Sequence, residues 1–314
     1  PSRLHFGLLP HTGNPENRRG GIGVMVDVPC LQMSAARSTD WKVIGPSSER
    51  VQRIIKTLWA DSIRRATPLC IRIDQSPPTH SGFGSGTQLS MSVAAILAYF
   101  HGNDHSSNDD IACKLGRGNR SRVGSKGFEV GGLIFDRGVG DESEFAVTIA
   151  PECHVVPEPW RWLTVTCERE LGKSGKAEQE AFAKGRPDSS KRVDLLHLID
   201  TELLPGLASQ DFHTFSDALG RYSRKCGEVF APQQGGLYGS LFAEEAAAHL
   251  ARAGITGIGQ SSWGPTIFAL FPNPDSAANF VKTNRWLHES SIRFSVSPSN
   301  NTGAVLSAGP VACS

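Results

Sequence analysis

Glycine, serine and threonine residues that can surround a phosphate group lie together in the stretch 82–87, which reads Gly-Phe-Gly-Ser-Gly-Thr. An apolar run of helical length, residues 89–100, follows it. Glycine lacks a Cβ, so the backbone can bring several N–H groups to one anion, and a helix start adds unpaired donors. The order predicts a phosphate cradle formed by Gly82, Gly84, Ser85, Gly86 and Thr87, with Thr87 as helix N-cap. A tight turn that feeds a packed helix is the alternative that this stretch alone leaves open.

The densest positive stretch, residues 117–126, carries four cations in ten residues: Arg117, Arg120, Arg122 and Lys126. A run of this kind is usually a solvated face. Guanidinium groups also bind phosphate and carboxylate oxygens in pairs, so the four are candidate substrate contacts. Arg19, in a second glycine-rich stretch, has the same two interpretations. Glu129 is the carboxylate nearest in sequence to the positive stretch. As a strand residue, Glu129 could equally be a structural partner.

The elements that must position these residues follow from hydrophobic periodicity. Residues 69–74 alternate as a half-buried strand before the cradle, and Arg3 and His5 share one face of a first strand, 2–9. Residues 47–65 form an amphipathic helix, and 127–138 are predicted as another strand. Prolines at 151, 157 and 159 mark a boundary, which predicts domains 1–155 and 156–314. The second domain has strands and helices in an α+β order.

Composition limits the class of protein. The chain has 314 residues, of which 39% are hydrophobic and 20% charged, with a net charge of +1. No global field therefore draws it to nucleic acid or to a membrane, and no apolar run has the length of a bilayer span. The first residues lack the apolar core of a secretion signal. Seven cysteines without a Cys-x-x-Cys pair fit reduced thiols, so a cytoplasmic location is expected.

Several motifs together carry a family resemblance. Pro-x-x-x-Gly-Phe-Gly-Ser-Gly-Thr from Pro78 resembles the central motif of the GHMP kinase superfamily. Three other segments resemble a non-kinase branch of that superfamily. They are Ser-Arg-Leu-His-Phe-Gly-Leu at the start, Gly-x-x-x-Phe-Glu-x-Gly-Gly ending at Gly132, and a Ser-Ser-Trp-Gly-Pro loop from Ser261. That branch is the β-ribofuranosylaminobenzene 5′-phosphate synthases. The resemblance runs from residue 2 to about residue 271.

The resemblance implies fold and activity. The fold is a two-domain GHMP architecture, with a ribosomal-protein-S5-like N-terminal domain and a ferredoxin-like C-terminal domain. The activity is that of a pentosyltransferase in methanopterin biosynthesis, which joins phosphoribosyl pyrophosphate to 4-aminobenzoate or 4-hydroxybenzoate at the ring carbon bearing the carboxylate. Carbon dioxide and pyrophosphate leave. Mg²⁺ is the expected cofactor, bound with the phosphates, and the family suggests a homodimer.

The resemblance also implies roles for residues. Arg3, His5, Lys126 and Glu129 are expected to be catalytic, and Arg117, Arg120 and Arg122 to bind phosphate beside the cradle. The residues expected to bind substrate are Arg19, Ser261, Ser262 and Trp263, although a loop tryptophan is more often simply packed.

Two other functions fit parts of the same pattern. An ATP-dependent GHMP small-molecule kinase would share the loop and the fold. The kinases, however, carry a catalytic Asp about seven residues before the paired glycines, where this chain has Gly124. They also place a second Ser where this chain has Gly86. A non-catalytic protein that binds a sugar phosphate is the other alternative.

Overall fold

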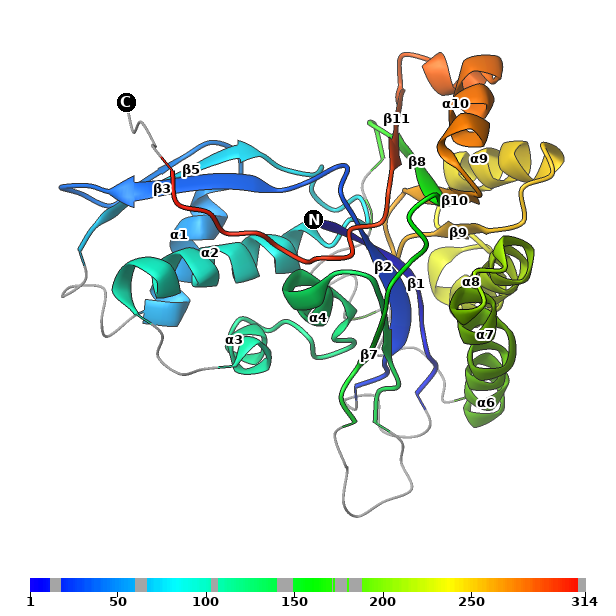
Figure 1. Ribbon diagram of the computed structural model, residues 1–314, viewed down its shortest axis with the longest axis horizontal. Helices are drawn as coiled ribbons and strands as arrows, with labels where there is room; N and C mark the ends of the chain where they lie inside the picture. The colour runs from blue at the N-terminus through cyan, green and yellow to red at the C-terminus, as the bar shows by residue number, and fades with distance from the viewer. Residues whose placement is uncertain are drawn as a thin grey trace.

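The computed structural model describes residues 1–11, 18–59, 67–102, 107–139, 149–170, 172, 180 and 188–309. Three sheets organise these residues (Figure 1). Sheet β1-β2-β6-β7 stands in the centre, sheet β3-β5-β4 lies with α1 and α2 on one side of it, and sheet β11-β8-β10-β9 lies on the other side. The hydrophobic pattern also predicts a strand over residues 145–149 and a helix over residues 177–184, and apart from residues 149 and 180 both lie outside the described residues.

The central sheet is antiparallel throughout and contains β1 (Ser2–Leu8), β2 (Gly21–Val26), β6 (Leu133–Asp136) and β7 (Glu152–His154). Leu4 and Phe6 of β1 point into a large apolar cluster, where Phe6 stacks on Trp162 with ring centroids 5.4 Å apart. Since side chains alternate along a strand, Arg3 and His5 lie on the opposite face. The cluster draws on residues from both sides of position 155, and the domain boundary there stays a prediction.

The sheet of the second half has ferredoxin-like topology. Its strands are β8 (Arg161–Cys167), β9 (Ile258–Gln260), β10 (Ile267–Phe271) and β11 (Ile292–Ser297), paired antiparallel in the order β11-β8-β10-β9. Helices separate β8 from β9 and β10 from β11, which gives the β-α-β-β-α-β order of that fold. The predicted α+β class is confirmed.

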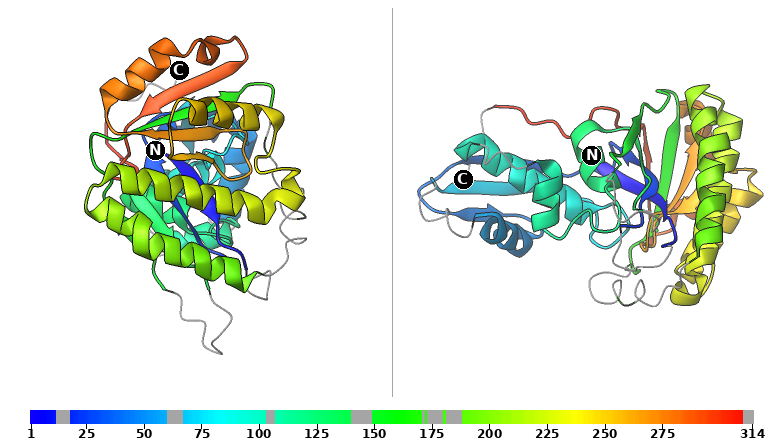
Figure 2. Two further views of the ribbon diagram at one scale, coloured as in Figure 1. Left: turned by 90° about the vertical axis from the view of Figure 1, so that its right-hand side faces the viewer. Right: turned by 90° about the horizontal axis from the view of Figure 1, so that it is seen from below.

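Helices cover both faces of this sheet. Figure 2 shows the long helix α8 (Phe212–Gln234) on the side away from α2, where Phe215, Leu219 and Tyr222 enter the large apolar cluster. The helices α9 (Leu241–Arg252) and α10 (Pro274–Thr283) form a second apolar cluster with Leu163, Val165 and Ile267. The remaining short helices of this half are α6 (Ser189–Leu198), the π-helix η1 (Ile199–Leu203), α7 (Leu204–Ala208) and the 3₁₀-helix η2 (Arg285–His288).

A third apolar cluster joins two helices to the outer sheet of the first half. That sheet contains β3 (Gln32–Arg37), β4 (Lys42–Ile44) and β5 (Leu69–Gln75), with β4 parallel to β5. Val51, Ile54 and Ile55 of α1 (Ser48–Trp59) and Leu89 and Val93 of α2 (Ser85–His101) pack against β5. The periodicity predicts α1, α2 and β5, whereas β3 and β4 were not predicted.

The predicted strand over residues 127–138 is wrong in its first part. Val123–Val130 is the helix α4, and the strand β6 begins only at Leu133. Gly131 and Gly132 separate them with φ values of 69° and 77°, a left-handed region that glycine enters without strain. Helix α3 (Asn108–Lys114) precedes α4 and begins with a capping box at Ser107. Within the described ranges no helix is long and apolar enough to cross a membrane.

Candidate active site

The glycine-rich turn between β5 and α2 is held in a conformation that needs glycine. Gly82 and Gly84 have φ values of 97° and 67°. A Cβ on Gly82 would collide with the carbonyl oxygen of Ser261, and one on Gly84 would lie 3.0 Å from Arg3 Nε. The helix begins at Ser85, and Gly84 occupies the N-cap, where its carbonyl oxygen accepts the N–H of Thr87 at 2.9 Å. The prediction that Thr87 is the N-cap is therefore wrong.

The turn is tied to the first strand and to the Ser261–Gly264 loop. Arg3 donates its backbone N–H to Phe83 O at 3.0 Å and its Nη2 to Gly82 O at 3.3 Å. The Ser261 hydroxyl donates to Gly82 O at 2.7 Å and accepts the backbone N–H of His5 at 3.0 Å. The N–H of Ser262 donates to His5 O at 3.1 Å. The structure thus brings together Arg3, His5, Ser261 and Ser262 with the predicted cradle, although these residues are more than 250 positions apart at the extremes.

His5 places a buried polar group in this site. Its side chain is 3% exposed, and its Nδ1 accepts the N–H of Gly7 at 3.2 Å. Burial, and secondarily the charge of Arg3, lower the pKa of His5 well below the ordinary value, so the ring is neutral. Because Nδ1 accepts, the ring proton lies on Nε2, which has no hydrogen-bond partner among the described residues. A buried donor without a partner is costly, and this one suits an acceptor on a ligand.

Two parts of the positive segment 117–126 meet the start of α2. A methyl group on Gly86 would lie 3.3 Å from Arg117 Nη1, and one on Gly124 would lie 3.3 Å from Thr87 Cγ2. The side-chain amide of Gln88 also donates to Gly124 O at 3.1 Å. Arg117 therefore stands beside the cradle, where its positive charge adds to the positive end of the helix dipole.

Arg19 and Arg120 form a second cationic pair. The N–H of Gly20 donates to Arg120 O at 2.9 Å, which joins the two segments. Arg19 is 4% exposed, and burial followed by the nearby charge of Arg120 lowers its pKa to about 10. Gly21 follows closely, and a Cβ there would lie 2.7 Å from His5 Cε1. The backbone that follows Arg19 therefore lies against the imidazole of His5.

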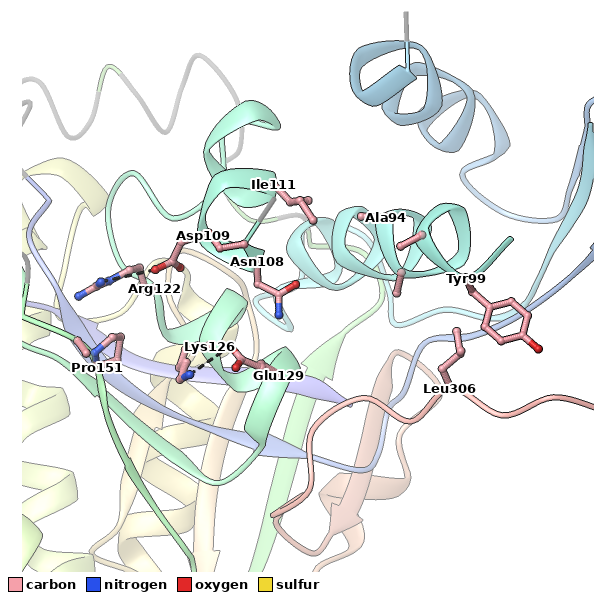
Figure 3. A pocket seen from close by; sticks show the side chains of 14 residues that line it. Ala94, Tyr99, Asn108, Asp109, Ile111, Arg122, Lys126, Glu129, Pro151 and Leu306 are labelled. Carbon is pink, nitrogen blue, oxygen red and sulfur yellow. Dashed lines mark hydrogen bonds and ion pairs between the residues drawn. The ribbon is translucent and has the colours of Figure 1, made fainter. Parts of the chain in front are cut away.

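The other two cations of the segment are neutralised by carboxylates. Arg122, 6% exposed, donates its Nη2 to Asp136 Oδ1 at 3.2 Å, and its backbone N–H donates to Asp136 Oδ2 at 2.8 Å. Lys126 pairs with Glu129 on the next turn of α4 at 3.1 Å. Both cations line a cavity of about 800 Å³ between α2, α3 and α4, where Figure 3 shows Lys126 directed at Glu129 and Arg122 at Asp109. Arg122, Lys126 and Glu129 are thus paired with one another or with Asp136, away from the start of α2.

Trp263 is a packing residue in this structure. It is 9% exposed and meets Phe230 edge to face, with ring centroids 5.5 Å apart, in a small apolar cluster with Leu8. It also borders a cavity of about 50 Å³ that His5 and Gln260 line. The contacts of Trp263 described here are therefore those of a packed side chain, which is the alternative that the sequence left open.

Two residues of this region escaped the sequence analysis. Asp136, fully buried at the end of β6, is the carboxylate that holds Arg122 and lies 3.6 Å from Arg18 Nε. The signal for Asp136 in the sequence is that a carboxylate ends an apolar strand, since a charge in that place needs a cationic partner. Arg50 of α1 reaches Gly86, but nothing in the pattern of that helix distinguishes it from the other polar residues.

The donors around the cradle suit anions rather than a metal held by the protein. Gly84 and Gly86 face the guanidinium groups of Arg3, Arg50 and Arg117. Across the described ranges, no three Asp, Glu, His or Cys side chains gather in a way that could hold a metal ion. Mg²⁺ prefers carboxylate oxygens together with phosphates, so these residues do not fit a resident Mg²⁺.

Known proteins resemble this chain in sequence and fold. Residues 203–284 match the family model described as GHMP kinases C terminal. Beta-ribofuranosylphenol 5'-phosphate synthase from Methanothermobacter thermautotrophicus is 27% identical over 86% of this chain and 87% of its own length. The protein of that name from Archaeoglobus fulgidus is 28% identical over 86% of both chains. The structure of Lactococcus lactis galactokinase superposes with a TM-score of 0.70, at 14% identity, over 96% of this chain and 92% of that one. The predicted relationship and the GHMP fold are confirmed.

Proposed function

We infer that this chain, which is related to the β-ribofuranosylphenol 5′-phosphate synthases and has the GHMP fold, is a pentosyltransferase that uses phosphoribosyl pyrophosphate. The acceptor that we propose is a para-substituted benzoate, and the product is a C-riboside 5′-phosphate of the methanopterin pathway. Because the relatives are named for a ribofuranosylphenol, we propose 4-hydroxybenzoate ahead of 4-aminobenzoate. The observation that carries the proposal is the gathering of the guanidinium groups of Arg3, Arg50 and Arg117 around Gly84 and Gly86 at the start of α2.

The proposed reaction balances without an added oxidant or base. The bond between C1 of the ribose and the pyrophosphate oxygen breaks, and the electron pair leaves with pyrophosphate. The ring carbon that bears the carboxylate, made electron-rich by the para oxygen, then forms a bond to C1. The bond to the carboxylate carbon breaks next, its electron pair returns to the ring, and carbon dioxide leaves. No proton is lost overall, so the reaction mainly requires orientation and stabilisation of the leaving charge.

The residues of the site match these requirements. The amides at the start of α2, with Arg3 and Arg117, supply fixed positive charge where pyrophosphate would depart. Arg19 and Arg120 suit the second anion, the 5′-phosphate or the benzoate carboxylate. The neutral ring of His5 would donate from Nε2 to a substrate oxygen.

We propose that Mg²⁺ enters as part of the phosphoribosyl pyrophosphate complex and not as a resident ion. The homodimer and the cytoplasmic location stay predictions.

The test is release of labelled carbon dioxide from carboxyl-labelled 4-hydroxybenzoate, with 4-aminobenzoate in parallel, in the presence of phosphoribosyl pyrophosphate and Mg²⁺. Release that requires phosphoribosyl pyrophosphate and yields pyrophosphate in equal amount is the expected result. The Arg120→Met variant should reduce release at low substrate concentration. A folded protein that releases none from either acid would refute the proposal, and phosphoryl transfer from ATP to a small molecule would then identify a kinase.

A further inference from the structure

The guanidinium of Arg50 occupies the space beside Gly86 that a side chain at that position would fill. A Cβ built on Gly86 collides with Arg50 Nη2 and approaches Arg50 Cζ to 3.0 Å. The kinases have a serine at this position, whereas this chain has Gly86 together with an arginine at position 50. The absence of a side chain at position 86 lets an arginine from α1 reach the first turn of α2.

The charge around Arg50 is positive. Arg117 Nη1 approaches the same point beside Gly86 to 3.3 Å, and Arg3 stands at Gly84, two residues earlier. Within the described ranges no carboxylate forms an ion pair with Arg50. Burial, followed by the charges of Arg117 and Arg53, lowers the pKa of Arg50 from its ordinary value. Like charges brought together at a helix N-terminus would be relieved by an anion with several negative charges.

The backbone of the first turn faces the same place. The N–H groups of Thr87 and Gln88 donate to Gly84 O, so the helix itself uses them. The amides of Ser85 and Gly86 precede them and belong to the donors that a helix cannot satisfy internally. An anion at this point would meet amides and guanidiniums together, with bidentate contacts that a guanidinium makes to phosphate oxygens.

We propose that Arg50 binds the pyrophosphate group of phosphoribosyl pyrophosphate through the opening that Gly86 provides. This assignment rests on the proposed function. Arg50 and Gly86 then act together: the glycine leaves the space, and the guanidinium that enters it supplies positive charge to the pyrophosphate.

The test is titration calorimetry with pyrophosphate on the full chain, without acceptor. Arg50→Ala should weaken pyrophosphate binding by roughly 10- to 100-fold, since charged hydrogen bonds are lost. Arg53→Ala is the matched control, because it removes the same charge one turn further along α1, and it should change binding by less than about 3-fold. Thermal unfolding of each variant checks that the fold is intact.

Gly86→Ser provides a second route that keeps Arg50 in the chain. The Gly86 contacts are with the end of a flexible side chain, so the serine should displace the guanidinium and leave the fold intact. We expect Gly86→Ser to weaken binding as much as Arg50→Ala does, and the double variant to be no weaker than either. Additive losses would show that position 86 does not act through Arg50, and would overturn their joint role.

The outcomes separate this inference from the proposed function. If the wild type releases carbon dioxide and binds pyrophosphate, but Arg50→Ala binds it equally well, only the role of Arg50 is refuted. If no carbon dioxide is released but pyrophosphate binding still depends on Arg50, the proposed reaction fails and the anion site stands. A wild type that does not bind pyrophosphate at all refutes the role of Arg50.

Discussion

Arg122→Met is expected to destabilise the fold and not to act mainly on substrate binding. Arg122 and Asp136 are 6% and 0% exposed, and Arg122 donates to this carboxylate through both its side chain and its backbone N–H. Methionine keeps much of the side-chain length but leaves Asp136 without its nearest side-chain cation. The segment that carries Arg120 would then lose one of the contacts that fix it beside the central sheet.

The magnitude follows from the contacts that remain. Removing one partner of a buried ion pair costs about 3–5 kcal/mol. Arg18 Nε stays 3.6 Å from Asp136 Oδ2, and the backbone N–H groups of Arg122 and Gly138 still donate to Asp136. The lost contact with Asp109 involves a side chain that is 57% exposed, so it adds less than about 1 kcal/mol. The expected loss in the free energy of unfolding is therefore about 3 kcal/mol, at the lower end of the range.

Urea unfolding followed by tryptophan fluorescence measures this loss, with Asp136→Asn and the double variant completing the cycle. The two single changes should be non-additive by about 1–3 kcal/mol, since each already removes the pair. Arg120→Met is the matched control and should leave stability nearly unchanged while raising KM for phosphoribosyl pyrophosphate. Wild-type stability for Arg122→Met, together with a ten-fold rise in that KM, would contradict the structural role and restore the substrate contact predicted from the sequence.

Three further predictions concern the cradle and its neighbours. Gly84→Ala and Gly116→Ala should each lower the free energy of unfolding by about 1–2 kcal/mol, because both glycines have left-handed φ values. Only Gly84→Ala should also weaken pyrophosphate binding in calorimetry, since no atom lies near a Cβ at Gly116. Arg19→Met should raise KM for an anionic substrate at least ten-fold, because it removes a cation from the proposed anion site, and an unchanged KM in steady-state kinetics would contradict that role. His5 has a lowered pKa in the folded state, so its unfolded form takes up a proton first and stability falls as pH drops below about 6.5, by up to about 1.4 kcal/mol per pH unit. Urea unfolding at about pH 7 and about pH 5.5 should show this slope in the wild type and its loss in His5→Gln; equal slopes would rule out His5 as the source.

Local patterns predict much of the fold because each depends on a short stretch of chain. The alternation over residues 69–74, the apolar run after Ser85 and the helical spacing in α1 each specify their element without distant partners. The helix α4 was missed because Gly124 and Gly127 reduce its apparent propensity. A Cβ at Gly127 would collide with Met25 Sδ and lie 2.6 Å from Met25 Cγ, so close packing of α4 on β2 is what requires glycine there.

The site was only partly predictable because its contacts join distant segments. The family resemblance implies that Arg3, His5 and Ser261 belong to one site, and the hydrogen bonds through Ser261 join His5 to the cradle. No sequence pattern shows that Arg50 meets Gly86 or that Asp136 meets Arg122, since each pair depends on how whole elements pack.

Packing also divides the four cations of segment 117–126 into two kinds, which the sequence treats alike. Arg122 and Lys126 meet carboxylates, and so their charge is used within the fold. Arg117 and Arg120 stand instead beside Arg50 and Arg19, whose pKa values are lowered first by burial and then by these neighbouring positive charges. An anion with charge at two ends would meet a pair of guanidinium groups at each end. A sugar that carries a pyrophosphate at one end and a phosphate at the other has that charge distribution, and it is the substrate that we propose for the two arginine pairs.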